Sequence, residues 1–112
     1  MANDLAVAFL DAFPLSAGHC LVVPPRHEPD FLALTQAEQV AIRALVPAVR
    51  RHIEVTGGPA GYNIGINVGE AAGQTVAHAH LDVIPRHEGD VPDPRGGVRW
   101  VIPAKAKYWE TR

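Results

Sequence analysis

The sequence has one cysteine, few aromatic residues (6%) and no excess of either charge, with 10 Lys and Arg against 12 Asp and Glu. A single cysteine excludes an intrachain disulfide and a cysteine-rich structural zinc site. The charge balance provides no basic field, so we expect no nucleic acid polymer as a partner. The chain has no apolar run as long as a membrane span and no basic N-terminal segment, so we expect a cytoplasmic protein without a membrane anchor.

What the chain does have is enough apolar sequence for one core. It has 112 residues, of which 47% are hydrophobic, so we expect a single domain over residues 1–112. Glycine and proline number 10 each, which predicts many turns. The 6 histidines are more than a chain of this size needs.

Alternating apolar residues predict the strands of a sheet. The strands are expected at residues 5–11, 19–23, 62–68 and 76–84, and residues 98–102 form a fifth short strand or an ordered arm. Pro24 and Pro25 stop the second strand. Residues 85–112 are expected to form a C-terminal loop and arm.

One main helix is predicted between the second and third strands. Thr35 and Glu38 form a capping box, and the apolar stripe that follows has the helical period up to about Val55. Pro47 lies inside this stripe and should kink or weaken the helix. A hairpin, a helix and further antiparallel strands make the fold class α+β, with a sheet of about five strands and the helix packed on it.

Three ionisable residues share one face of the strand predicted at residues 76–84. His78, His80 and Asp82 alternate with apolar residues, and such residues are costly to bury without a purpose. A solvated face at a sheet edge is the plainer interpretation. The small Gly and Asn residues that alternate along residues 61–67 leave space beside the sheet and favour a site.

The spacing alone fits two kinds of chemistry. Two imidazoles and a carboxylate are a plausible ligand set for zinc or iron, which would make the chain a metal-dependent hydrolase using His78, His80 and Asp82. A neutral imidazole is also a nucleophile that can attack phosphorus and form a transient phospho-histidine bond.

From Leu5 to about Pro103, the chain resembles the histidine triad (HIT) family of nucleotide hydrolases and transferases. The resemblance rests on four blocks in order and register: FLDAFP (9–14), GHCLVVP (18–24), NIGINVGEAAGQT (63–75) and HAHLDVIPR (78–86). The family motif is His-φ-His-φ-His-φ-φ, with φ apolar. The VIPR segment and the following Gly89-Asp90 resemble the fragile-histidine-triad and bacterial hydrolase branches.

The resemblance implies catalytic roles for the histidines. His80 would be the nucleophile that takes up the nucleotidyl group, His78 would orient and support it, and His19 would complete the cluster from the neighbouring strand. The resemblance also implies a purine nucleotide or nucleotide conjugate as substrate, a homodimer, and no metal or other cofactor in this site.

The resemblance implies nucleotide-binding roles for five further residues. These are Asp11 for the ribose hydroxyls, Asn67 near the ribose and phosphate, Gln74 and Thr75 in the phosphate-binding turn, and Phe9 as a wall of the base pocket. Each has a plainer interpretation: Asp11 as a turn former, Gln74 and Thr75 as turn caps, and Phe9 as a core residue.

Other histidines and the cysteine are given structural interpretations. Without the resemblance, His19 would be assigned to the core. Cys20 is expected to be buried on the face opposite His19. Surface positions are expected for His27, His52 and His87.

Asp82 departs from the family motif, because it stands where the third histidine is found. An ionised aspartate only accepts hydrogen bonds, and a phosphate about 4 Å away would be repelled by roughly 4 kcal/mol at an effective dielectric near 20. Asp82 would instead pair with a protonated His19 or His78, or take up a proton when ligand binds.

Three functional hypotheses therefore remain. The first is a hydrolase of nucleoside phosphoramidates or dinucleoside polyphosphates, with turnover reduced by Asp82. The second is an inert AMP-binding module, and the third is the metal-dependent hydrolase.

Overall fold

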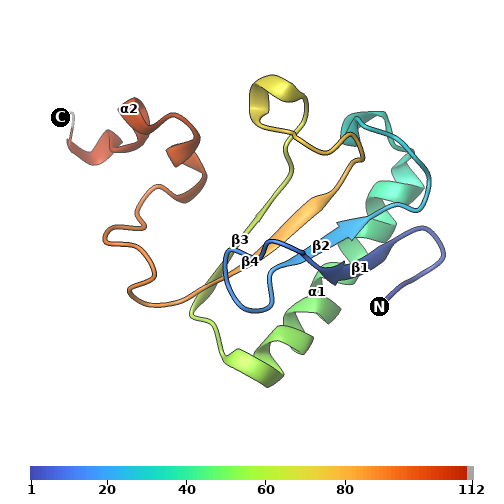
Figure 1. Ribbon diagram of the computed structural model, residues 1–112, viewed down its shortest axis with the longest axis horizontal. Helices are drawn as coiled ribbons and strands as arrows, with labels where there is room; N and C mark the ends of the chain where they lie inside the picture. The colour runs from blue at the N-terminus through green and yellow to red at the C-terminus, as the bar shows by residue number, and fades with distance from the viewer. Residues whose placement is uncertain (111–112) are drawn as a thin grey trace.

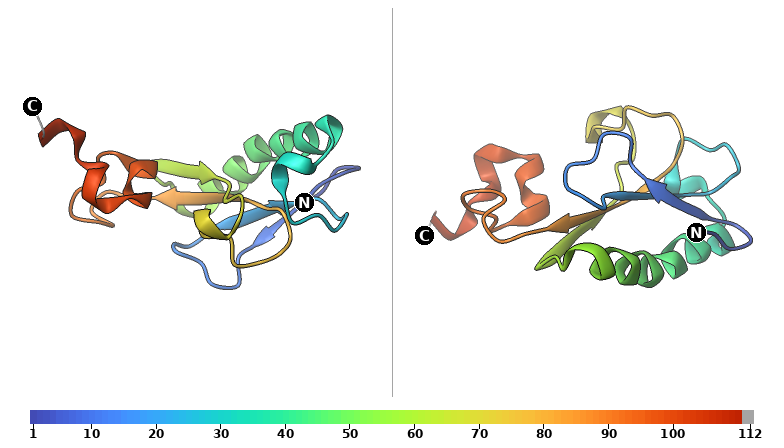
Figure 2. Two further views of the ribbon diagram at one scale, coloured as in Figure 1. Left: turned by 90° about the horizontal axis from the view of Figure 1, so that it is seen from above. Right: turned by 60° about the horizontal axis from the view of Figure 1, so that its bottom comes forward.

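The computed structural model describes residues 1–110 and contains a four-stranded antiparallel sheet (Figure 1). The strands are β1 (Val7–Leu10), β2 (Cys20–Val23), β3 (Gly61–Gly65) and β4 (Leu81–Arg86), in the order β1-β2-β4-β3. One long helix, α1 (Gln36–Gly57), lies along one face of the sheet (Figure 2). The predicted α+β class with one main helix is confirmed, although the described sheet has 4 strands rather than about five.

Helix α1 begins at the predicted capping box. The Glu38 backbone N–H donates to Thr35 Oγ1 (3.1 Å), and the Thr35 backbone N–H donates to Glu38 Oε1 (2.9 Å). Pro47 does not end the helix, which runs on to Gly57 and is closed by Gly58 in the left-handed conformation. The predicted helix boundaries are therefore close to those observed.

The core lies between α1 and the helix-facing residues of the sheet. Val22 and Val83 are fully buried beside Ile42 of α1. Cys20 is buried on this same side, as expected, and burial raises the pKa of its thiol. Since neighbours along a strand alternate in direction, His19 and Asp82 belong to the opposite face of the sheet.

The strand predicted at residues 76–84 is wrong at its start, because β4 begins only at Leu81. In the register of β2 and β4, Val22 pairs with Leu81, so Ala79 would stand opposite Pro24. Proline has no backbone N–H to donate, and the ladder stops there. His78 and His80 therefore lie in the segment that enters β4, although the alternation of burial continues through the buried Ala79.

The other strand predictions also change. β1 is shorter than residues 5–11, and β3 ends at Gly65 instead of Val68, so Asn67 lies outside the sheet. Residues 98–102 do not form a strand. Residues 98–101 fall in a 3-10 helix (Gly97–Val101), and Ile102 connects it to α2 (Pro103–Ala106). This arm projects from the end of the sheet away from α1 (Figures 1 and 2). Within residues 1–110, no helix has the length and apolar character needed to cross a membrane.

Glu38 ties the start of α1 to the segment after β2. Its side chain is 7% exposed and accepts two hydrogen bonds from Arg26, at 3.0 and 2.8 Å. These bonds, with the one from the Thr35 backbone, lower the Glu38 pKa from 4.5 to about 2.

We expect the stabilisation from Glu38 to be complete above about pH 4.5 and to be lost as the pH falls towards 2, because the carboxyl must then take up a proton in the folded state. The measurement is the thermal midpoint of the parent and of Glu38→Gln between pH 6 and pH 2.5. The difference between the two thermal midpoints should become smaller as the pH falls. A difference that stays constant contradicts the low pKa of Glu38.

Candidate active site

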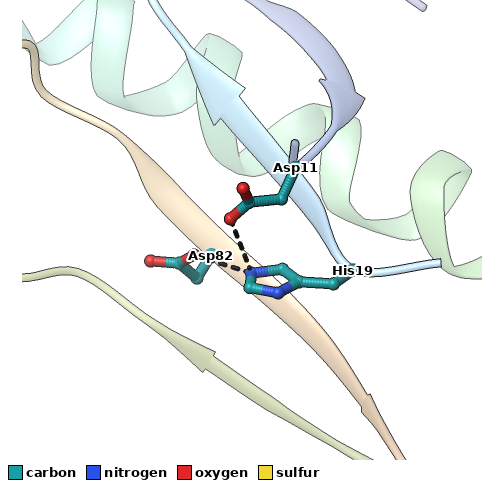
Figure 3. A group of neighbouring side chains, drawn as sticks. All are labelled: Asp11, His19 and Asp82. Carbon is teal, nitrogen blue, oxygen red and sulfur yellow. Dashed lines mark hydrogen bonds and ion pairs between the residues drawn. The ribbon is translucent and has the colours of Figure 1, made fainter. Parts of the chain in front are cut away.

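Two carboxylates converge on one histidine nitrogen at the open face of the sheet (Figure 3). His19 Nε2 lies 2.8 Å from Asp82 Oδ1 and 3.5 Å from Asp11 Oδ2. The three residues come from different segments: Asp11 follows β1, His19 precedes β2 and Asp82 lies in β4. His19 is only 4% exposed, whereas each carboxylate side chain keeps about a fifth of its surface exposed (20%).

The tautomer of His19 is set by the loop between β1 and β2. The Leu15 backbone N–H donates to His19 Nδ1 (3.1 Å), so Nδ1 presents its lone pair. The proton of the neutral ring is then on Nε2, which donates to Asp82 Oδ1. The predicted pairing of Asp82 with His19 is therefore observed as a hydrogen bond between Nε2 and Oδ1.

His80 has the opposite arrangement. Its Nδ1 lies 2.8 Å from the backbone carbonyl oxygen of His78. A carbonyl only accepts, so Nδ1 is the donor and Nε2 of the neutral ring carries the lone pair. The side chain is 15% exposed, and Nε2 lies 3.9 Å from Asp82 Oδ2. The lone pair of His80 Nε2 therefore lies close to the carboxylate cluster.

The imidazole of His78 binds a different part of the chain. Its Nε2 donates to the Pro24 carbonyl oxygen (2.7 Å), which ties the segment before β4 to the end of β2. Support for His80 comes from the His78 backbone. His27, for which the sequence suggested only a surface position, is indeed exposed, and its ring lies 5.6 Å from that of His78.

The residues predicted to bind nucleotide are not all brought together. Asp11 does two things, since its Oδ1 accepts from the Phe13 backbone N–H in a turn (2.9 Å) while its Oδ2 faces His19. Phe9 lies on the same face of β1 and is 47% exposed. Asn67 and Thr75 are exposed beyond the sheet.

The side-chain amide of Gln74 joins two loops by hydrogen bonds. Its Oε1 accepts from the Gly69 backbone N–H, and its Nε2 donates to the carbonyl oxygens of Pro29 and Val76. Both ends of its amide are therefore occupied, which matches the plainer interpretation of this residue as a turn cap. The turn that it holds leaves Thr75 open to solvent.

A metal ion would find a different ligand set from the one that the spacing suggested. Within the described residues, the potential ligand atoms of Asp11, His19 and Asp82 lie within 4.8 Å of one another. His78 does not join them, because its Nε2 is bonded to Pro24. Ligation by His19 Nε2 would require the Nε2 proton to leave while Leu15 still donates to Nδ1, so this tautomer opposes metal binding.

The α+β domain thus carries two histidines just before β4 and a third just before the neighbouring strand β2. The family model for the HIT domain matches residues 1–89, and the chain belongs to this family. The match ends near the start of the projecting arm.

Relatives with named activities are similar over the same region. The chain is 40% identical over 88 residues to the asymmetrical bis(5'-nucleosyl)-tetraphosphatase of Schizosaccharomyces pombe, and 35% identical over 88 residues to an adenylylsulfatase of Arabidopsis thaliana. Each match covers 79% of this chain, but only 48% and 45% of those proteins. A HIT-like protein of Mycoplasma genitalium is 42% identical over 86 residues, and there the chain spans 61% of the relative's length.

Solved structures confirm the fold. A HIT family protein from Bacillus anthracis superposes with a TM-score of 0.76 at 39% identity, covering 80% of this chain and 64% of that one. A zinc-bound histidine triad family protein from Mycobacterium smegmatis covers 100% of this chain and 86% of that one, with a TM-score of 0.73 at 31% identity. Nucleotide-processing activity is thus present among the relatives of this chain.

Proposed function

We propose that this chain hydrolyses nucleotide conjugates through a nucleotidyl-histidine intermediate on His80. The observation that carries the proposal is the hydrogen bond from His80 Nδ1 to the His78 carbonyl, which leaves the Nε2 lone pair free beside the cluster. In the first half-reaction Nε2 attacks the α-phosphorus and the leaving group departs. In the second, water attacks the same phosphorus and His80 is regenerated.

The remaining residues are given supporting roles. Asp11 would accept hydrogen bonds from ribose hydroxyls through Oδ2, since its Oδ1 is used in the turn. Phe9 would form part of a base pocket, and Asn67 and Thr75 lie exposed and would reach the ligand from the loops before β4. We further propose that the active form is a cytoplasmic homodimer.

The alternative is an AMP-binding module without turnover, and the charge of Asp82 is the observation that favours it. None of the ion pairs among residues 1–110 brings an Arg or Lys to this carboxylate. An uncompensated anion beside a bound phosphate slows reactions that build up negative charge there.

Two measurements separate the hydrolase from the inert module. The first is the binding of AMP by calorimetry. The second is the turnover of three compounds: an adenosine 5'-phosphoramidate, adenylyl sulfate and diadenosine tetraphosphate. Binding of AMP together with release of AMP from at least one compound supports the hydrolase. Binding without turnover of any compound supports the inert module.

A further inference from the structure

Asp82 presents a free carboxylate oxygen beside the proposed nucleophile. Its Oδ1 accepts from His19 Nε2 at 2.8 Å, whereas its Oδ2 lies 3.9 Å from His80 Nε2. His19 is in turn held by the Leu15 backbone N–H. The orientation of the carboxylate is therefore fixed by the protein, and Oδ2 is the atom left for a ligand.

The charged side chains nearest to Asp82 make the surroundings of its Oδ2 negative. Asp11 places a second carboxylate 3.5 Å from the same His19 nitrogen. In the sheet register Asp82 stands between Leu21 of β2 and Gly65 of β3, neither of which carries charge. The arginines that make ion pairs in the described residues are paired elsewhere, such as Arg86 with Asp90 and Arg26 with Glu38.

A substrate attacked by His80 must bring its phosphoryl group against this oxygen. Because Oδ2 lies 3.9 Å from Nε2, a phosphorus atom that approaches this nitrogen and the groups bonded to it come close enough to feel the charge of the carboxylate. An ionised carboxylate offers only lone pairs. A group that contacts it favourably must donate a hydrogen bond or carry positive charge.

We propose that Asp82 is a specificity-determining residue that selects the leaving group by its charge, favouring amines over phosphates. This inference rests on the proposed function. An amine joined to phosphorus has an N–H that can donate to Oδ2, and the released amine becomes an ammonium ion that pairs with the carboxylate. The bridging oxygen of a phosphoanhydride has only lone pairs, and the released phosphate is an anion that Asp82 repels.

The reaction balances without another co-reactant. As the bond from phosphorus to His80 Nε2 forms, the bond from phosphorus to the amine nitrogen breaks, and the nitrogen leaves with that electron pair and takes up one proton from water, which gives the neutral amine and a hydroxide ion. The hydroxide is neutralised by the proton that the second half-reaction returns to solvent, and the further proton that makes the amine an ammonium ion comes from the P–OH group of the released nucleotide. A second water then attacks phosphorus and passes a proton to the Asp82 carboxylate, which returns it to solvent. The electron pair of the P–N bond goes back to Nε2.

The test compares two substrates that share the adenylyl group, an adenosine 5'-phosphoramidate of a simple alkylamine and diadenosine tetraphosphate. We measure kcat/KM for each with the parent chain, with Asp82→Asn, which removes the charge but keeps the shape, and with His87→Ala as a control at an exposed position after β4. We expect the ratio of amine to polyphosphate turnover to fall at least tenfold in Asp82→Asn and to stay unchanged in His87→Ala.

The outcomes separate this inference from the proposed function. If the parent and Asp82→Asn both turn over the two substrates with the same ratio of kcat/KM values, Asp82 does not select the leaving group by charge. The nucleotidyl-histidine mechanism is not contradicted by that result. No turnover of either compound by the parent or by either variant contradicts the proposed function, and this inference fails with it. A general loss of structure in Asp82→Asn is checked by its thermal midpoint and by repeating the comparison with Asp82→Ser.

Discussion

Substitution His80→Ala is expected to lower turnover by at least about 10³-fold, because it removes the nitrogen that attacks phosphorus. His80→Asn is the sharper variant. Its side-chain amide can still donate to the His78 carbonyl, so the bond that orients the wild-type ring is kept while the nucleophilic lone pair is lost. Both variants should bind AMP about as well as the parent.

The matched control for His80 is His87→Ala, which removes an exposed imidazole in the loop after β4. Steady-state release of AMP and calorimetric binding are measured for all four proteins. Retained turnover in His80→Asn would mean that another group attacks phosphorus, and a loss of AMP binding in step with turnover would assign His80 to binding alone.

Asp82→His is expected to raise kcat/KM for diadenosine tetraphosphate at least tenfold. The substitution replaces an acceptor-only anion by a ring that can donate to the phosphoryl group, and it restores the family motif at this position. A unit charge at about 4 Å and an effective dielectric near 20 contributes roughly 4 kcal/mol of repulsion, which sets the upper limit of the gain.

The same variant should gain nothing, or lose activity, on the alkylamine phosphoramidate, because the partner of the amine is removed. Parallel kinetics on the two substrates check this result, with AMP binding as the control for an intact site. Equal rates for the parent and Asp82→His on the polyphosphate would show that Asp82 costs no activity.

The features that could be predicted from the sequence are the local ones. The capping box of Thr35 and Glu38 involves residues three apart, so its pattern is visible in the chain and marks the start of α1 correctly. The alternation of residues 79–85 likewise shows which side chains face the helix, because it reflects the geometry of a strand.

The limits of the strands could not be predicted in the same way, because they depend on the neighbouring strand. β4 begins late since Pro24 stands opposite Ala79 in the register, and that register is known only once β2 and β4 are paired. The hairpin of β1 and β2, by contrast, lies within one short stretch of chain, and the alternation of its two strands predicts it.

The sequence indicates which residues to consider for the candidate site better than it indicates the contacts that they make. The spacing and the resemblance indicated His19, His80 and Asp82, and the structure places His19 and His80 each within 4 Å of the Asp82 carboxylate. The backbone groups that fix the two tautomers, the Leu15 N–H and the His78 carbonyl, have no signature in residue type. The hydrogen bond from Gln74 to the Pro29 carbonyl oxygen likewise has no signature, because the two residues belong to loops that come together only in the folded chain.

The most direct test of the account is to trap the intermediate. The parent chain is mixed with an adenosine 5'-phosphoramidate and quenched rapidly in alkaline denaturant, where a phosphorus–nitrogen bond to histidine survives. Intact-protein mass spectrometry and peptide mapping then locate any added nucleotidyl group. We expect one adenylyl group on His80 in the parent and none on that peptide in His80→Asn. Turnover with no adduct, or with the adduct on another residue, would contradict it.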